Sequence, residues 1–266
     1  MTSSSRPVAL VTGASAGIGK ELAKVLARDH DLILTARRVD ELNRLAAELK
    51  STHGISCHVV PADLADPAGP RTLFDTISAT GLRVDVLVNN AGFGDLSPFA
   101  TADLSKMLRM IQVNVTALTE LTGLFLPGMR SRGQGRVLNV GSVAGFQPGP
   151  MMGVYYATKA FVNSLSQSMA NELAGSGITV TCLCPGPTDS EFAAVAGMQS
   201  SRAFSVGHRL SARAVAERGV AGMKRGKALV IPGGRNKLLI FLQRFAPRSA
   251  VIQVVRWMQE KRLGRQ

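Results

Sequence analysis

The segment YYATK contains the pair of residues best suited to chemistry in this chain. Tyr155 and Lys159 are four positions apart, so in a helix they share one face. A free phenol titrates near ~10 and is a poor acid–base group at neutral pH, but a neighbouring ammonium lowers that pKa. We therefore expect Tyr155 to exchange a proton with a substrate oxygen under the influence of Lys159. Tyr156 has Ala160 at the equivalent position, and we expect it to pack.

Two further polar residues could act with this pair. The segment GRVLNVGS ends a strand-like run at Ser142, whose hydroxyl could polarise a carbonyl oxygen. Asn114, in the helical stretch QVNV, could hold a water that links Lys159 to solvent. Taken alone, Tyr155 would more simply be a core tyrosine with a satisfied hydroxyl. The combined pattern instead favours an acid–base site acting on a carbonyl or an alcohol.

The first strand-like run leads into TGASAGIG, a glycine-rich turn that opens a helix. Gly13, Gly17 and Gly19 would let the turn tighten and let the backbone approach a pyrophosphate. The helix N-terminus would then present free N–H groups to that anion. Because the strand, turn and helix occur in the required order, the sequence predicts a dinucleotide site rather than an ordinary turn.

The end of the second strand indicates which dinucleotide binds. In such folds an acidic residue here binds the 2′-hydroxyl of NAD, whereas Arg37 and Arg38 suit the 2′-phosphate of NADP. Ser15 could add a hydrogen bond to that phosphate. The alternative is that both arginines are ordinary surface residues. At later strand exits, Asp63 could accept from the adenine amino group, and Asn90 in NNAG would line the ligand crevice.

These motifs can form one site only if their strands belong to one sheet with all carboxyl ends at the same edge. Short apolar runs alternate with longer amphipathic stretches, which argues for one parallel sheet with helices on both faces. Strands are predicted at residues 8–12, 31–36, 56–61, 84–89, 136–140, 178–184 and 228–231. Helices are predicted at residues 17–28, 39–52, 67–79, 101–131, 152–174 and 211–225.

Together these motifs resemble those of the short-chain dehydrogenase/reductase family, over roughly Val8 to Phe192. The resemblance implies an α/β fold: a Rossmann-like, doubly wound, seven-stranded parallel sheet in a single domain, with a homodimer or homotetramer as the assembly. It implies four catalytic residues, in which Ser142 orients the substrate oxygen and Tyr155 transfers the proton. Lys159 would bind the nicotinamide ribose and tune Tyr155, and Asn114 would maintain the proton relay.

The resemblance also implies the contacts of the cofactor, NADP(H). Thr188 stands where the family often has Val or Ile, but its backbone N–H can still serve the carboxamide. The expected cofactor-binding residues are Gly13, Ser15, Ala16, Gly17, Ile18, Gly19, Arg37, Arg38, Asp63, Leu64, Asn90, Ala91, Gly92, Tyr155, Lys159, Pro185, Gly186 and Thr188. The substrate wall would come from residues 93–99, 143–152 and 192–210, whose Met and Phe content favours an apolar substrate. Residues 193–210, of weak periodicity, could move over the pocket.

The C-terminal quarter differs from the rest of the chain in charge. Residues 1–199 contain 16 Lys and Arg and 16 Asp and Glu, whereas residues 200–266 contain 15 Lys and Arg and only two acidic residues. Residues 235–266 form a helical extension, predicted as two amphipathic helices separated by Pro247. These helices would pack against the domain or a second subunit, or lie on an anionic membrane or an acidic carrier protein.

Three functions are compatible with these patterns. The first is an NADP-dependent oxidoreductase acting on a small-molecule carbonyl or alcohol, the second a non-catalytic NADP-binding redox sensor. The third is an acyl, ketoacyl or steroid reductase at a membrane surface. We expect no nucleic-acid partner and no metal, since the histidines show no ligand spacing, and we expect the three cysteines to pack unpaired. With neither a signal-peptide pattern nor a spanning apolar run, the expected location is cytoplasmic, with peripheral membrane contact as a variant.

Overall fold

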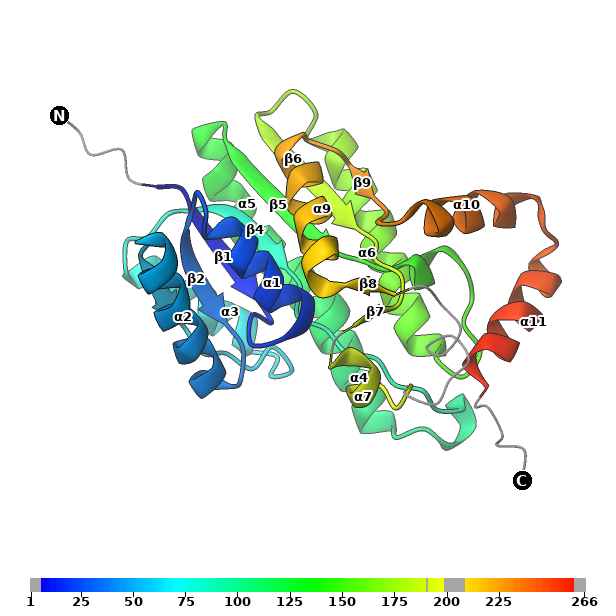
Figure 1. Ribbon diagram of the computed structural model, residues 1–266. Coiled ribbons are helices and arrows are strands. Elements are labelled where there is room, and N and C mark those ends of the chain that lie inside the picture. Colours follow the sequence, from blue (N-terminus) through cyan, green and yellow to red (C-terminus); the bar gives the residue numbers. More distant parts are fainter. Residues whose placement is uncertain (1–5, 190, 199–208, 261–266) are drawn as a thin grey trace.

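The computed structural model describes residues 6–189, 191–198 and 209–260, and its centre is a parallel sheet of seven strands (Figure 1). The strands follow the order β3-β2-β1-β4-β5-β6-β9, and every neighbouring pair is parallel. All seven predicted strands are present, with β3 and β9 shorter than expected. Their bounds are β1 (Val8–Thr12), β2 (Asp31–Thr35), β3 (Cys57–Val59), β4 (Val84–Asn89), β5 (Gly135–Val140), β6 (Ile178–Leu183) and β9 (Leu229–Val230).

Helices cover both faces of the sheet, because both faces carry apolar side chains. One core layer joins α1 (Gly17–Leu26), α2 (Val39–His53) and α9 (Ala212–Lys224) to alternate residues of β1 and β2. The opposite layer joins α3 (Gly69–Ala79), α5 (Leu118–Arg132) and α6 (Gly153–Glu172) to the remaining residues. The Rossmann-like, doubly wound α/β fold predicted from the sequence is confirmed.

The strand order reverses between β1 and β4, and this determines where a ligand can bind. The chain winds outward from β1 to β3 on one side and from β4 to β9 on the other. At such a switch point the connecting loops diverge, which opens a crevice at the carboxyl ends of the strands. The glycine-rich turn after β1 and the exits of β4 and β5 all lie at this edge.

The prediction of one continuous helix at residues 101–131 is wrong, because this segment consists of several shorter elements. It is divided into a 3-10 turn (Phe99–Thr101), α4 (Leu104–Ile111), a π-helical segment (Gln112–Ala117) and α5. Asp103 caps α4 by accepting hydrogen bonds from the backbone N–H groups of Ser105 and Lys106. The π-helical segment contains Asn114, and such segments are frequent at functional sites because the wider turn redirects a side chain.

The C-terminal helices extend away from the sheet, at the right of Figure 1 in orange and red. They are α10 (Gly234–Leu242), a 3-10 turn (Gln243–Phe245) and α11 (Arg248–Gln259). The predicted break at Pro247 is confirmed, since Pro247 is the residue before α11. None of the helices in the described part of the chain combines the length and apolar character needed to span a bilayer.

A small parallel pair, β7 (Thr188–Asp189) with β8 (Leu210–Ser211), lies beside the main sheet. The short helix α7 (Phe192–Val195) follows β7. Of the segment predicted to move over the pocket, residues 199–208 lie outside the described residues.

Candidate active site

The turn between β1 and α1 forms an anion cradle. Gly13 has φ +65°, a conformation that side chains disfavour, and a Cβ on Gly19 would lie 2.2 Å from the Gly13 carbonyl oxygen. The N-cap of α1 is Ala16, which makes no side-chain hydrogen bond. The first N–H groups of α1 are therefore left for an external acceptor, which is what a pyrophosphate requires.

The end of β2 places a guanidinium beside this cradle. Arg38 Nε donates to Ser15 Oγ at 3.3 Å, and its Nη2 lies 3.0 Å from Glu191 Oε2. Arg37 and Arg38 are both exposed and both line the same cavity. An NADP 2′-phosphate bound here would meet Arg38 and Ser15 together and would compete with Glu191 for the guanidinium. The local arrangement fits a phosphorylated ribose.

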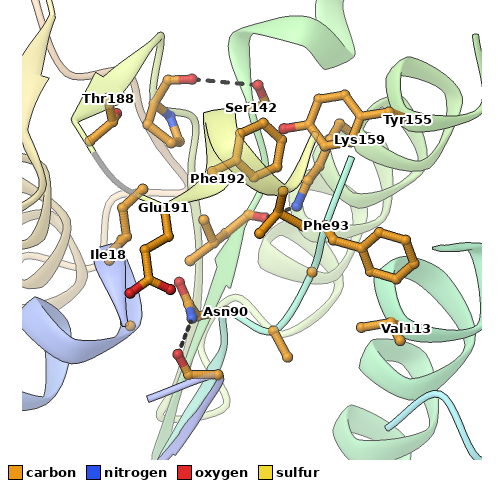
Figure 2. Close-up of a pocket in the computed structure, with 18 of the residues that line it drawn as sticks. Ile18, Asn90, Phe93, Val113, Ser142, Tyr155, Lys159, Thr188, Glu191 and Phe192 are labelled. Carbon is orange, nitrogen blue, oxygen red and sulfur yellow. Dashed lines mark hydrogen bonds between the residues drawn. The ribbon is translucent and has the colours of Figure 1, made fainter. Parts of the chain in front are cut away.

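The exits of β3 and β4 complete the cofactor side of the cavity. Asp63 is exposed, and its Oδ1 accepts from the Ala65 backbone N–H at 3.0 Å. Asn90 Nδ2 donates to the carbonyl oxygens of Thr12 and Gly13, which ties the β4 exit to the glycine-rich turn (Figure 2). Asn90 therefore shapes the cradle through the backbone that it fixes.

Ser142 lies at the exit of β5 and is buried. Its Oγ accepts from the Ala144 N–H at 3.0 Å and faces the Pro185 carbonyl oxygen at 3.5 Å. Asn163, on α6, positions the backbone of Ser142: its Nδ2 donates to the Ser142 carbonyl oxygen at 2.9 Å. The hydroxyl is thus fixed beside the cavity, and Figure 2 shows the Tyr155 side chain next to it.

Tyr155 and Lys159 lie on the same face of α6 and are both buried. Lys159 Nζ donates to the Val140 carbonyl oxygen at 2.8 Å and lies 5.9 Å from the centre of the Tyr155 ring. Across the cavity, the Phe192 ring centre is 5.3 Å from that of Tyr155. The phenol is therefore enclosed between an ammonium and an aromatic ring.

Burial changes the acidity of both groups. Burial raises the pKa of Tyr155 well above its usual 10.0, and the Ser142 side chain opposes this rise. Burial lowers the pKa of Lys159 from 10.5 to about 8, with the buried thiols of Cys182 and Cys184 acting in the opposite direction. The expectation that Lys159 gives Tyr155 a lowered pKa is thus wrong for this structure, because desolvation of the phenol dominates.

Asn114 lies behind the cavity rather than on its wall. Its Oδ1 accepts from the Phe93 N–H at 3.1 Å, and its Nδ2 donates to the Phe93 carbonyl oxygen and to Thr158 Oγ1. A Cβ on Gly92 would lie 2.9 Å from Asn114 Oδ1 and 3.6 Å from Lys159 Nζ. Asn114 and Lys159 therefore both lie beside Gly92. The proton-relay role expected of Asn114 stays a prediction.

One cavity of about 790 Å³ brings the predicted residues together. With the exception of Asn114, every predicted catalytic and cofactor-binding residue lines it: Gly13, Ser15, Ala16, Gly17, Ile18, Gly19, Arg37, Arg38, Asp63, Leu64, Asn90, Ala91, Gly92, Ser142, Tyr155, Lys159, Pro185, Gly186 and Thr188. In the described residues, no cluster of three or more His, Cys, Asp and Glu side chains could hold a metal. The three cysteines are buried and unpaired, as predicted.

Several residues in or behind the cavity were not singled out from the sequence. Glu191 pairs with Arg38, and Asn163 fixes Ser142. Gln259 enters from α11 and donates to the Tyr156 hydroxyl at 2.7 Å. Polar residues in helices carry no periodic signal, so only the tertiary contacts show what they do.

Comparison with known proteins agrees with this geometry. Residues 7–200 match the profile of the short chain dehydrogenase family. The very-long-chain 3-oxoacyl-CoA reductase of Anas platyrhynchos is 37% identical over 184 residues, which cover 66% of this chain and only 58% of that enzyme. A solved short-chain dehydrogenase from Sphingobium yanoikuyae in complex with NADPH is 33% identical, with a TM-score of 0.81 over 96% of this chain and 99% of that one.

A second solved structure is similar along nearly the whole chain. The bulky-bulky ketone specific alcohol dehydrogenase from Comamonas testosteroni is 29% identical, with a TM-score of 0.76, and the match covers 98% of this chain and 96% of that one. The family profile covers well over half of the present sequence. This chain therefore belongs to the short chain dehydrogenase family.

Proposed function

We propose that this chain catalyses the NADP(H)-dependent interconversion of a carbonyl group and an alcohol on a predominantly apolar substrate. The observation that carries the proposal is the convergence of Ser142, Tyr155 and Lys159 on a cavity that also contains the anion cradle. The NADPH complex of the similar Sphingobium yanoikuyae enzyme and the ketone specificity of the Comamonas testosteroni enzyme support it.

Ser142 and Tyr155 would have different roles in the reduction. When bound, NADPH supplies the hydride. Ser142 would donate a hydrogen bond to the substrate carbonyl oxygen, and Tyr155 would transfer its proton to that oxygen as negative charge develops there. Burial raises the pKa of Tyr155, so the phenol holds its proton at neutral pH and can act as the acid when a carbonyl is reduced.

The substrate end of the cavity is apolar. Met152, Phe192, Met198 and Val255 are in one buried or partly buried cluster with Tyr155. Such a wall excludes water from the reacting oxygen and lowers the local dielectric, which strengthens the hydrogen bonds made there. It also favours a substrate that presents hydrocarbon to the wall.

A non-catalytic NADP-binding sensor is the rival function. Such a protein would need the cradle and Arg38 but not a buried ammonium beside a buried phenol. Lys159 is almost fully buried and its pKa is lowered, so keeping it there costs folding free energy. A group retained at such a cost favours catalysis over sensing.

We expect wild-type enzyme to reduce apolar ketones with a higher kcat/KM for NADPH than for NADH, measured by the absorbance of the reduced nicotinamide. Replacing Arg38 by aspartate should reduce that preference by about 10- to 100-fold, because it removes the guanidinium that the 2′-phosphate would meet. Arg44→Asp, an exposed change farther along α2, is the matched control and should keep the preference. Equal kcat/KM for both cofactors in the wild type would contradict the assignment.

We also propose that α10 and the start of α11 contact an anionic lipid surface. Five large apolar side chains on α10 and the turn after it are more than half exposed: Leu238, Leu239, Phe241, Leu242 and Phe245. The stretch from Gly234 to Gln259 contains five cations and no acidic residue. Self-association would bring these like charges together, whereas an anionic bilayer would accept both the charges and the apolar side chains.

Vesicle sedimentation tests this contact. The protein should bind vesicles of phosphatidylcholine with phosphatidylglycerol, and less so at high salt, but not vesicles of phosphatidylcholine alone. Leu238→Ser with Leu242→Ser should abolish binding, while Leu104→Ser with Leu108→Ser, exposed apolar positions on α4, should not. Concentration-dependent self-association without vesicle binding would show instead that a second copy covers the helices. The predicted homodimer or homotetramer otherwise stays a prediction.

A further inference from the structure

An ion pair joins the cofactor side of the cavity to α7 on its substrate side. Arg38 Nη2, between β2 and α2, lies 3.0 Å from Glu191 Oε2, at the start of α7. Both residues line the cavity, and Figure 2 shows the Glu191 side chain directed toward the cofactor side, where Ile18 and Asn90 lie. The Arg38 and Glu191 side chains are 48% and 61% exposed, so a ligand in the cavity can reach both of them.

The Glu191 carboxylate occupies the guanidinium that a 2′-phosphate would use. Arg38 also donates from Nε to Ser15 Oγ and from Nη2 to the Ser15 carbonyl oxygen, which directs the guanidinium toward the glycine-rich turn. A phosphate bound there would stand beside the carboxylate, and the two like charges would repel each other. An ion pair this exposed is weak, so a phosphate dianion can displace Glu191, whereas the neutral 2′-hydroxyl of NAD cannot.

Phe192, the residue after Glu191, packs on the reacting phenol. The ring centres of Phe192 and Tyr155 are 5.3 Å apart, and both residues belong to the apolar cluster of the substrate wall. A Cβ on Gly94 would lie only 2.8 Å from Phe192 Cζ, so the ring is also in close contact with the segment after β4. A ketone that binds against the side of Tyr155 covered by Phe192 therefore has to displace that ring.

We infer that Glu191 is a specificity-determining residue that couples the 2′-phosphate site to the substrate chamber; this rests on the NADP(H)-dependent function proposed above. In the ligand-free enzyme, Glu191 holds Arg38 and positions Phe192 on Tyr155. The 2′-phosphate of NADP(H) takes Arg38 from Glu191, which releases the start of α7 and lets Phe192 leave the phenol. NADP(H) thus prepares the chamber for the ketone, whereas NAD(H) leaves Glu191 in place.

Two nucleotides without a nicotinamide test the phosphate site: adenosine 2′,5′-bisphosphate and AMP, which differ only in the 2′-phosphate. In titration calorimetry, Glu191→Gln should bind the bisphosphate about three- to tenfold more tightly than the wild type does, with unchanged affinity for AMP. In an Arg38→Met background, the same change should affect neither nucleotide. Asp189→Asn is the matched control, because it removes an equal charge from a nearby carboxylate that pairs with Arg209. It should bind the bisphosphate as the wild type does.

Decalone, a fused-ring ketone, tests the link to the substrate chamber. Saturating adenosine 2′,5′-bisphosphate should raise the affinity of the wild type for decalone about three- to tenfold, and AMP should not. Neither nucleotide contains the nicotinamide end of the cofactor, so direct contact with the ketone does not explain such an effect. Glu191→Gln should bind decalone at the higher affinity with or without the bisphosphate. A merely structural role of Glu191 would not make decalone binding depend on a 2′-phosphate.

Three results would overturn the inference. The first is an equal gain for the bisphosphate and AMP in Glu191→Gln, and the second is a gain that persists in the Arg38→Met background. The third is a wild-type affinity for decalone that does not respond to the bisphosphate. All these titrations are made without turnover. A protein that reduces no ketone would therefore contradict the proposed function, while the binding data alone decide the role of Glu191.

Discussion

Replacing Tyr155 by phenylalanine should lower kcat for ketone reduction by about 10²- to 10⁴-fold, the usual range for loss of a positioned acid. The change removes only the hydroxyl, since the ring can keep its contacts with Phe192 and Tyr156. The glycine-rich turn and Arg38 are untouched, so NADPH should still bind. Steady-state kinetics together with quenching of protein fluorescence by NADPH measure the two effects separately.

Tyr156→Phe is the matched control for this prediction. It removes a hydroxyl from the next residue, whose oxygen is hydrogen-bonded to Gln259. Turnover of a simple ketone should stay near the wild-type value. Near-normal reduction by Tyr155→Phe, or an equal loss in both variants, would show that the Tyr155 hydroxyl is not the proton donor.

The sheet and the cofactor cradle were predictable because local signals dominate there. Continuous apolar strands such as β4 identify a buried parallel sheet, and the glycine-rich turn needs conformations available to few other residues. The cavity also brings together Arg38 and Ser15, as expected from their place at the ends of β2 and β1. In these parts of the chain, residues that are close together in the sequence are sufficient to predict the local structure.

The π-helical segment was not predictable in the same way. An apolar pattern continues through residues 101–131, so periodicity alone indicates one helix. The widened turn at Asn114 is fixed by tertiary hydrogen bonds with Phe93 and Thr158. These partners are 21 and 44 residues away in the chain, and no local pattern encodes them.

The C-terminal helices differ from prediction for a related reason. The sequence predicts an apolar stripe on α11 made of Val251, Val254, Val255 and Met258. Val251 and Val255 do face inward, but Val254 and Met258 are exposed and the polar Gln259 is buried beside Val255. A count of apolar residues misses Gln259, because its burial depends on the hydrogen bond to Tyr156. On α10, the predicted apolar face is largely exposed instead of packed against the sheet domain.

Lys159→Met should abolish reduction and yet make the protein more stable at neutral pH. Burial lowers the pKa of Lys159 from 10.5 to about 8, a difference that corresponds to about 3 kcal/mol of cost for the charged form. The variant loses the hydrogen bond to the Val140 carbonyl oxygen, which offsets part of the gain. We expect a net gain of about 1–2 kcal/mol in the free energy of unfolding, measured by urea denaturation.

The pH dependence of the stability difference shows whether the buried charge of Lys159 causes it. Below pH 8 both folded and unfolded chains hold the lysine proton, and the wild type bears the full cost. Between about 8 and 10.5 the unfolded chain binds more protons than the folded one, so wild-type stability rises with pH. The advantage of Lys159→Met should therefore shrink across that window. The raised pKa of Tyr155 affects both proteins alike and cancels in the comparison.

Lys227→Met provides the matched control, because Lys227 is an exposed lysine and its removal should give no such pH-dependent gain. If Lys159→Met is less stable than the wild type at every pH, or if its advantage does not change with pH, the ammonium is not strained by burial. The expected result would mean that the fold keeps the destabilising charge of Lys159 beside the Tyr155 phenol and the expected position of the nicotinamide. Such a result would be an instance of stability given up at a catalytic site in exchange for activity.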